Sequence, residues 1–173
     1  MKIFQLFAGV LLLTTAGFAQ NKNSFNEADW LGTWKGNLII ITPGKSSSVN
    51  MVLTVGKTDT PGKYSWKTTY GEGAAKLEKN YFMIGKDIEN GKWELDEDNT
   101  IIIDFFFGDN AFYSFFETKG ILLSSRYELR NGKIIAEVTS SQEGKAIVSG
   151  TGDSQVISYP VYVIQKGELT REN

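Results

Sequence analysis

The feature that most constrains the fold of this chain is a regular succession of short alternating segments, with almost no helical periodicity. Apolar and polar residues alternate over strand-length runs, and most runs end at Gly, Pro, Asn or Asp. The alternation is sharpest where Tyr64, Trp66 and Tyr70 share one face and Lys63 and Lys67 share the other. These patterns predict an all-β protein.

About ten strands are expected, and their turns carry specific signals. The predicted strands are residues 34–41, 49–56, 63–70, 75–86, 92–95, 100–107, 111–118, 121–130, 133–139 and 156–165. Asn90-Gly91 and Asn131-Gly132 predict tight hairpin turns, because both residue types tolerate positive φ. Pro160 cannot donate to a ladder, so a bulge or a local edge is expected in the last strand. The polar stretch 140–154 predicts a loop, and residues 25–31 predict one short helical turn.

Most links between these segments are short, and this determines the topology. Strands joined by short links are sequential neighbours and must be antiparallel. An open sheet of about ten strands would leave two exposed edges and would tend to curl. We therefore predict an all-β fold in which an antiparallel up-and-down meander closes into a barrel of about ten strands. One domain over residues 20–173 is expected.

The N-terminal residues have the pattern of an export signal. Lys2 supplies a positive start, and an apolar run follows from Ile3 to Leu13. Gly17 and Ala19 then place small side chains at the −3 and −1 positions of a cleavage site before Gln20. The run is shorter than the roughly 20 residues of a membrane-spanning helix. We therefore expect residues 1–19 to be a signal peptide, and the mature protein to be periplasmic or extracellular with no membrane span. An uncleaved anchor is the alternative.

The chain contains neither Cys nor His, which excludes several kinds of site. A Ser-His-Asp triad, a Cys nucleophile, a zinc site built on His or Cys, and haem held by either residue are all excluded. We expect no cofactor, assign no catalytic residue and assign no metal ligand; the acidic turn 96–99 is interpreted as solvated. The net charge of −2 does not favour nucleic acid, whose phosphates require a basic face.

A short motif precedes the first predicted strand. It reads Leu31-Gly32-Thr33-Trp34-Lys35-Gly36, and a Gly-x-Trp at this place resembles the calycin group of barrels, which includes lipocalins and fatty-acid-binding proteins. The resemblance implies that Gly32 permits close backbone approach and that Trp34 plugs the closed end of the barrel. It also implies a basic side chain from the end of the last strand lying across Trp34. Lys166 is positioned for this contact, and Arg171 is the other option.

Two charged residues could lie inside such a barrel. Arg126 either points to solvent beside Glu128, or faces a cavity and binds a carboxylate with its planar guanidinium. Asp104 interrupts the apolar run 101–107, and a run that is apolar on both faces suggests burial on both sides. A buried Asp must be paired or protonated. Asp104 could therefore pair with Arg126 inside the barrel, or lie at a bulge or partly exposed on a wall.

Aromatic side chains are dense, and most are expected in the core. An apolar cavity that is lined by rings and a few polar groups is typical of a small-molecule site. The candidate ligand contacts are therefore Tyr64, Trp66 and Tyr113 together with Arg126 and Asp104.

Three functions fit these patterns, and the fold alone does not choose among them. The first is a lipocalin-like barrel that binds a small apolar or amphipathic molecule, such as a lipid, in an interior cavity. The second is a non-enzymatic module that binds glycan or protein through exposed Trp66 or Trp93. The third is an enzyme with two acidic groups facing each other in a cleft. The candidate acids are Glu94, Asp96, Asp104, Glu117, Glu128 and Glu137.

Overall fold

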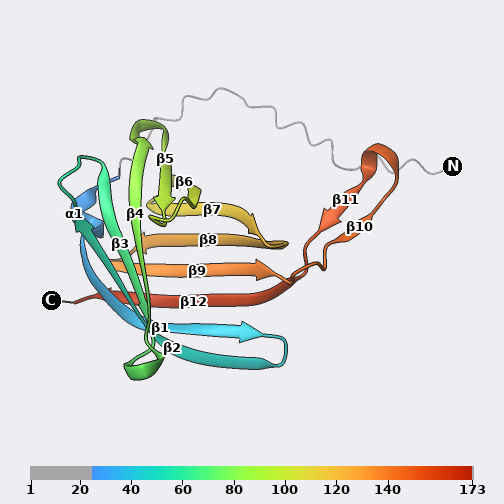
Figure 1. Cartoon of the computed structure of the whole chain (residues 1–173), viewed down its shortest axis with the longest axis horizontal. Helices are drawn as coiled ribbons and strands as arrows, with labels where there is room; N and C mark the ends of the chain where they lie inside the picture. Colours follow the sequence, from blue (N-terminus) through green and yellow to red (C-terminus); the bar gives the residue numbers. More distant parts are fainter. Residues whose placement is uncertain (1–24, 173) are drawn as a thin grey trace.

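The computed structural model describes residues 25–172, which form one closed antiparallel barrel with a short appended hairpin (Figure 1). The signal peptide and cleavage site predicted for residues 1–19 lie outside the described residues. A one-turn helix, α1 (Glu27–Trp30), precedes the first strand. The barrel strands are β1 (Gly32–Thr42), β2 (Lys45–Lys57), β3 (Lys63–Tyr70), β4 (Leu77–Asp87), β5 (Lys92–Asp96), β6 (Ile102–Gly108), β7 (Ala111–Thr118), β8 (Ile121–Arg130), β9 (Lys133–Ser141) and β12 (Val161–Arg171).

The strand order confirms the predicted meander and its closure. Around the barrel it is β1-β12-β9-β8-β7-β6-β5-β4-β3-β2, and each pairing is antiparallel. β1 pairs with β2 from Gly32↔Val55 to Thr42↔Lys45, and with β12 from Trp34↔Arg171 to Ile41↔Ile164. Because β1 bonds to both neighbours along most of its length, the sheet has no free edge at its first strand. The predicted fold class and the short N-terminal helical turn are both confirmed.

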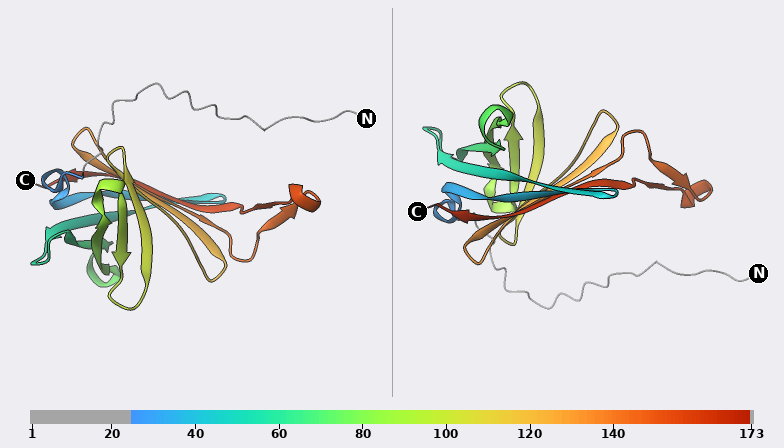
Figure 2. Two further views of the ribbon diagram at one scale, coloured as in Figure 1. Left: turned by 90° about the horizontal axis from the view of Figure 1, so that it is seen from above. Right: turned by 90° about the horizontal axis from the view of Figure 1, so that it is seen from below.

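The C-terminal part of the barrel differs from the sequence prediction. The expected loop 140–154 contains a strand, β10 (Ile147–Ser149), which pairs with β11 (Val156–Ser158). This hairpin projects beyond one end of the barrel (Figures 1 and 2). The expected last strand is divided at Pro160, which lacks a backbone N–H, and the pairing of β12 with β9 is irregular just after it. β12 then continues to Arg171 rather than ending at residue 165.

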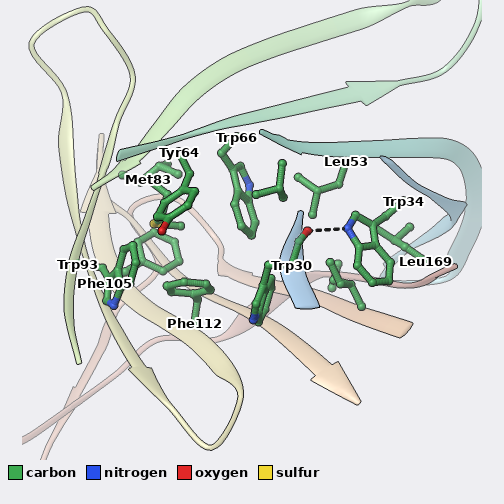
Figure 3. Close-up of a cluster of buried hydrophobic side chains, with 14 of the residues drawn as sticks. Trp30, Trp34, Leu53, Tyr64, Trp66, Met83, Trp93, Phe105, Phe112 and Leu169 are labelled. Carbon is green, nitrogen blue, oxygen red and sulfur yellow. Dashed lines mark hydrogen bonds between the residues drawn. The ribbon is translucent and has the colours of Figure 1, made fainter. Parts of the chain in front are cut away.

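The end of the barrel beside α1 is filled by large aromatic side chains (Figure 3). Trp30, Trp34, Phe107 and Phe112 are almost completely buried there. The Trp30 and Phe112 rings meet edge to face with centroids 5.0 Å apart, and Trp34 Nε1 donates a hydrogen bond of 2.9 Å to the Trp30 carbonyl. The indole of Trp34 therefore joins the start of β1 to the last residue of the helix.

Arg171 covers the Trp34 plug from outside, so the expectation that Lys166 does so is wrong. The Arg171 guanidinium lies 4.5 Å from the centre of the Trp34 ring, and its Nη2 donates to the Ala28 carbonyl at 3.3 Å and to the Asp29 carbonyl. Lys166 is exposed further along β12, opposite Ile39. The prediction failed because it ended the last strand too early, whereas the strand continues until Arg171 lies opposite Trp34.

Substitution of Gly36 tests whether the fold requires the close approach of the β1 and β12 backbones. A Cβ atom at Gly36 would lie 2.1 Å from the Glu168 carbonyl oxygen, which is backbone and cannot turn away. We expect Gly36→Ala to lower the free energy of unfolding by roughly 1–3 kcal/mol, measured by urea denaturation.

Gly56→Ala is the matched control for this change. Its Cβ would meet only the Ser65 hydroxyl, at 2.7 Å, and that side chain can rotate. The control should therefore lose clearly less stability than Gly36→Ala. Equal losses in the two variants would show that close packing of β1 on β12 does not limit the stability of the barrel.

Candidate ligand-binding cavity

A cavity of about 210 Å³ lies inside the barrel, beyond the aromatic cluster that fills the end near α1. Six aromatic side chains line it: Trp66, Tyr70, Tyr81, Phe105, Phe116 and Tyr127. They come from β3, β4, β6, β7 and β8 and face the interior because side chains alternate along each strand. Half of the barrel strands therefore contribute aromatic side chains to the wall of the cavity.

Trp66 forms the boundary between the filled end and the cavity. Its ring centroid lies 6.1 Å from that of Trp30 and 5.9 Å from that of Phe112, which belong to the filled end (Figure 3). The Tyr127 ring approaches Trp66 from the cavity side at 5.3 Å, with the two planes at 84°. These two rings therefore make a nearly right-angled corner of the cavity wall.

Three phenols give the cavity polar groups that stay uncharged. Burial raises the pKa of Tyr70. Burial, aided by the negative charge of Glu97, raises the pKa of Tyr81 to about 12. Burial raises the pKa of Tyr127 further still. Since all three pKa values lie above that of an ordinary tyrosine, the hydroxyls are neutral hydrogen-bond donors and acceptors at neutral pH.

Among residues 25–172, the only formal charge in the lining of this cavity is the carboxylate of Glu97, in the turn after β5. Ser125 and Gln165 add uncharged polar groups, and the Ser125 hydroxyl shares a hydrogen bond of 2.7 Å with that of Ser114. No Lys or Arg of the described part of the chain is among the lining residues. A molecule in the cavity would thus meet rings, hydroxyls and one negative charge.

Arg126 lies on the outer wall of the barrel, so its interpretation as an interior carboxylate ligand is wrong. Its Nη2 is 2.7 Å from Glu128 Oε2, and its Nε donates to the Tyr113 hydroxyl at 3.4 Å. Its side chain is 34% exposed. Because neighbouring residues of a strand face opposite ways, Ser125 and Tyr127 at the cavity put Arg126 outside. The alternative in which Arg126 points to solvent beside Glu128 is therefore confirmed.

Asp104 and Tyr113 belong to a separate groove on the outer surface, with a volume of about 690 Å³. The ladder between β6 and β7 pairs only Phe106–Tyr113, Phe107–Phe112 and Gly108–Ala111, so beyond Phe106 the two strands are no longer paired. Asp104 is exposed on that stretch, so the alternative that placed it on a wall of the barrel holds, and the alternative of a buried pair with Arg126 is wrong.

Apolar rings border this outer groove. Phe106 is 56% exposed and Phe115 is 75% exposed, and both line it. The suggestion that the run 101–107 is buried on both sides is wrong, because Phe105 and Phe107 are buried inside the barrel whereas Phe106 lies on its outer face. The groove and the cavity share only the wall residue Phe105.

Tyr64 faces the interior but does not line the cavity. It lies at the filled end, where Figure 3 labels it. Its hydroxyl donates a hydrogen bond of 2.8 Å to Glu27 Oε2 in the helix. Of the five candidate ligand contacts, only Trp66 lines the cavity. Sequence reasoning missed Tyr81, Glu97 and Tyr127 as cavity residues. Tyr127 could have been found, because its alternation with Arg126 assigns the two to opposite faces.

The structure also bears on the other functions expected from sequence. Trp66 and Trp93 are 2% and 1% exposed, so binding through these two tryptophans at the surface is excluded. The lining of the cavity contains one carboxyl group, whereas two facing acids were expected of a hydrolytic site. Two of the candidate acids, Glu94 and Asp104, lie opposite each other on β5 and β6 and line the outer groove instead. Within residues 25–172 there is no group of three or more acidic side chains arranged to hold a metal ion. In the same range no helix is long and apolar enough to span a bilayer.

Comparisons with known proteins agree with the architecture. No protein-family model matches the chain, and no curated protein matches it. A protein of unknown function from the DUF3598 family of Nostoc punctiforme is similar in structure, with a TM-score of 0.58 and 13% identity over 86% of this chain. The aligned region spans 50% of that protein. An S-type phycobiliprotein lyase, CPES, from Guillardia theta has a TM-score of 0.59 and 9% identity, over 84% of this chain and 90% of its own. At these identities the likeness shows the fold, which is that of a calycin-like β-barrel.

Proposed function

We propose that this protein is an exported barrel that binds a small amphipathic molecule in the cavity beyond Trp66. The observation that carries the proposal is a cavity lined by six aromatic rings, three of which are neutral phenols. Small-molecule sites in proteins combine an apolar, ring-rich wall with a few placed polar groups. Export is supported by the N-terminal sequence pattern alone.

The size of the cavity limits the part of a ligand that it can hold. Its volume of about 210 Å³ is well above the roughly 10–15 Å³ needed for one water molecule. It is below the range of about 300–1,000 Å³ that is typical of sites for drug-sized ligands. The cavity therefore suits a molecule of one or two rings, or the end of a longer one that projects from the barrel.

The polar groups favour a ligand with a hydrogen-bonding end. Hydroxyls of Tyr70, Tyr81 and Tyr127 remain protonated at neutral pH and can donate to a ligand oxygen or nitrogen. The fold neighbour that is a phycobiliprotein lyase supports the use of such a barrel for a small molecule, although at 9% identity it carries no binding residue to this chain. The wall of rings would hold the apolar part of the ligand.

Cavity filling tests this proposal. N-phenyl-1-naphthylamine is a neutral fluorophore with a fused two-ring naphthyl end and a phenyl end, and its emission rises in apolar sites. One end of this molecule suits a cavity of about 210 Å³, so the unmodified protein should bind it saturably. Val138 lines the cavity, so Val138→Phe should weaken this binding roughly tenfold by occupying part of the space. The matched control is Val161→Phe, because Val161 is 58% exposed at the start of β12. Circular dichroism would verify that both variants fold.

Two results of this experiment would contradict the proposal. The first is an unmodified protein that does not bind the fluorophore. The second is equal binding by the two valine variants, which would place the fluorophore outside the cavity, with the exposed rings of Phe106 and Phe115 as the next place to examine.

The raised pKa of Tyr81 predicts a loss of stability at high pH. In the unfolded chain this phenol ionises near pH 10, whereas in the fold its pKa is about 12. The unfolded state therefore loses its proton first, so the contribution of Tyr81 to stability is complete below about pH 10 and declines as the pH rises towards 12. Urea denaturation at several pH values should show this decline, and it should be shallower in Tyr81→Phe. An unchanged slope in the variant would mean that Tyr81 is not a buried neutral phenol.

A further inference from the structure

The electrostatic character of the cavity follows from where the basic side chains lie. Arg126 is on the outer wall, paired with Glu128, and Arg171 covers Trp34 at the filled end. On β3 and just before β4, Lys67 and Lys76 both pair with Glu78, at 2.6 Å and 3.1 Å. None of these residues lines the cavity, whose charged lining residue is Glu97. Among the lining residues that the structure describes, an anionic ligand would find no cation and would be repelled by a carboxylate.

The aromatic lining is a second reason for the cavity to prefer a cation to an anion. The faces of Trp, Tyr and Phe rings carry negative quadrupole charge and attract cations, most strongly in the case of Trp. The cavity has one Trp, three Tyr and two Phe rings, and its Trp66–Tyr127 corner is nearly perpendicular. Several rings around a site, together with a carboxylate, form the kind of cage that recognises substituted ammonium groups.

The phenols are compatible with this preference. Burial keeps them protonated and neutral, so they offer a cationic ligand oxygen lone pairs, and their O–H groups can donate to other polar atoms of the ligand. Glu97 and Tyr81 both line the cavity, and the negative charge of Glu97 contributes, after burial, to the raised pKa of that phenol.

We propose that the cavity selects an organic cation, an amine or a quaternary ammonium group carried on an apolar body, with Glu97 as its counter-charge and Trp66 and Tyr127 as its aromatic walls. This inference rests on the proposed function, since it names the class of molecule that the same cavity takes. It differs from the fatty-acid carboxylate that an interior Arg126 would have implied.

Competition with N-phenyl-1-naphthylamine separates the charge classes. Phenyltrimethylammonium and benzoate each carry one ring and opposite charges. In low-salt buffer at neutral pH, phenyltrimethylammonium should displace the fluorophore at a concentration roughly tenfold lower than benzoate does, because cation–π attraction and the Glu97 charge both favour it. Equal displacement by the two compounds, or stronger displacement by benzoate, would overturn the inference.

Substitution of Glu97 tests whether its carboxylate causes the preference for a cationic ligand. Glu97→Gln keeps the size of the side chain and should weaken phenyltrimethylammonium roughly fivefold, as expected for a partly exposed charge pair. In the same variant the affinity for the neutral fluorophore should fall less than the affinity for phenyltrimethylammonium, because the fluorophore carries no charge that Glu97 would attract. Glu97→Lys should weaken binding of the cation further and strengthen binding of benzoate. A general loss of structure would weaken both.

Glu137→Gln is the matched control, because Glu137 is exposed on β9 and does not line the cavity. It should leave all three affinities unchanged. If Glu97→Gln and Glu137→Gln behave alike, the assignment of Glu97 as counter-charge is wrong. The two proposals fail separately: absence of fluorophore binding overturns the proposed function, whereas fluorophore binding without a preference for the cation overturns only the selectivity.

Discussion

The rest of this structure depends on the pairing of the first barrel strand with the last. β1 and β12 are paired from Trp34↔Arg171 to Ile41↔Ile164, and this pairing closes a meander that would otherwise be an open, curling sheet. The same register places the Arg171 guanidinium over Trp34 and next to the carbonyls of α1. Closure, the plug and the helix are therefore held at one place, by backbone hydrogen bonds and one cation–π contact in a chain without Cys.

Closure of this kind divides the interior into a filled part and an open part. Trp30, Trp34, Phe107 and Phe112 occupy the space near the helix, where large rings pack edge to face. Beyond Trp66 the lining changes to phenols and smaller side chains, which leave about 210 Å³. The chemistry of the barrel is thus concentrated in one half, and the alternation of each strand determines which side chains reach it.

Much of the fold could be predicted from the sequence, but little of the site could. The pattern at 63–70 assigned Trp66 to an interior face correctly, because alternation is local. The same reasoning left both orientations of Arg126 open, although Tyr127 beside it is apolar enough to face inward. Lys166 was preferred over Arg171 because the last strand was predicted to end at residue 165. The local pattern does not show that this strand is split at Pro160 and continues to Arg171. Glu97 lies in an acidic turn that looks like any solvated turn until the barrel places it at the cavity.

The sequence by itself determined that this protein is all-β, that its strands follow one another as antiparallel neighbours, and that Trp34 begins the barrel, since alternation, turn residues and short links act over a few residues. Only the tertiary structure decided that Arg126 faces outward, that Arg171 covers the plug, and that Glu97 and three phenols surround one cavity. The physical reason is that these relations depend on register and closure, which join residues far apart in the chain and are fixed by the packing of the whole barrel.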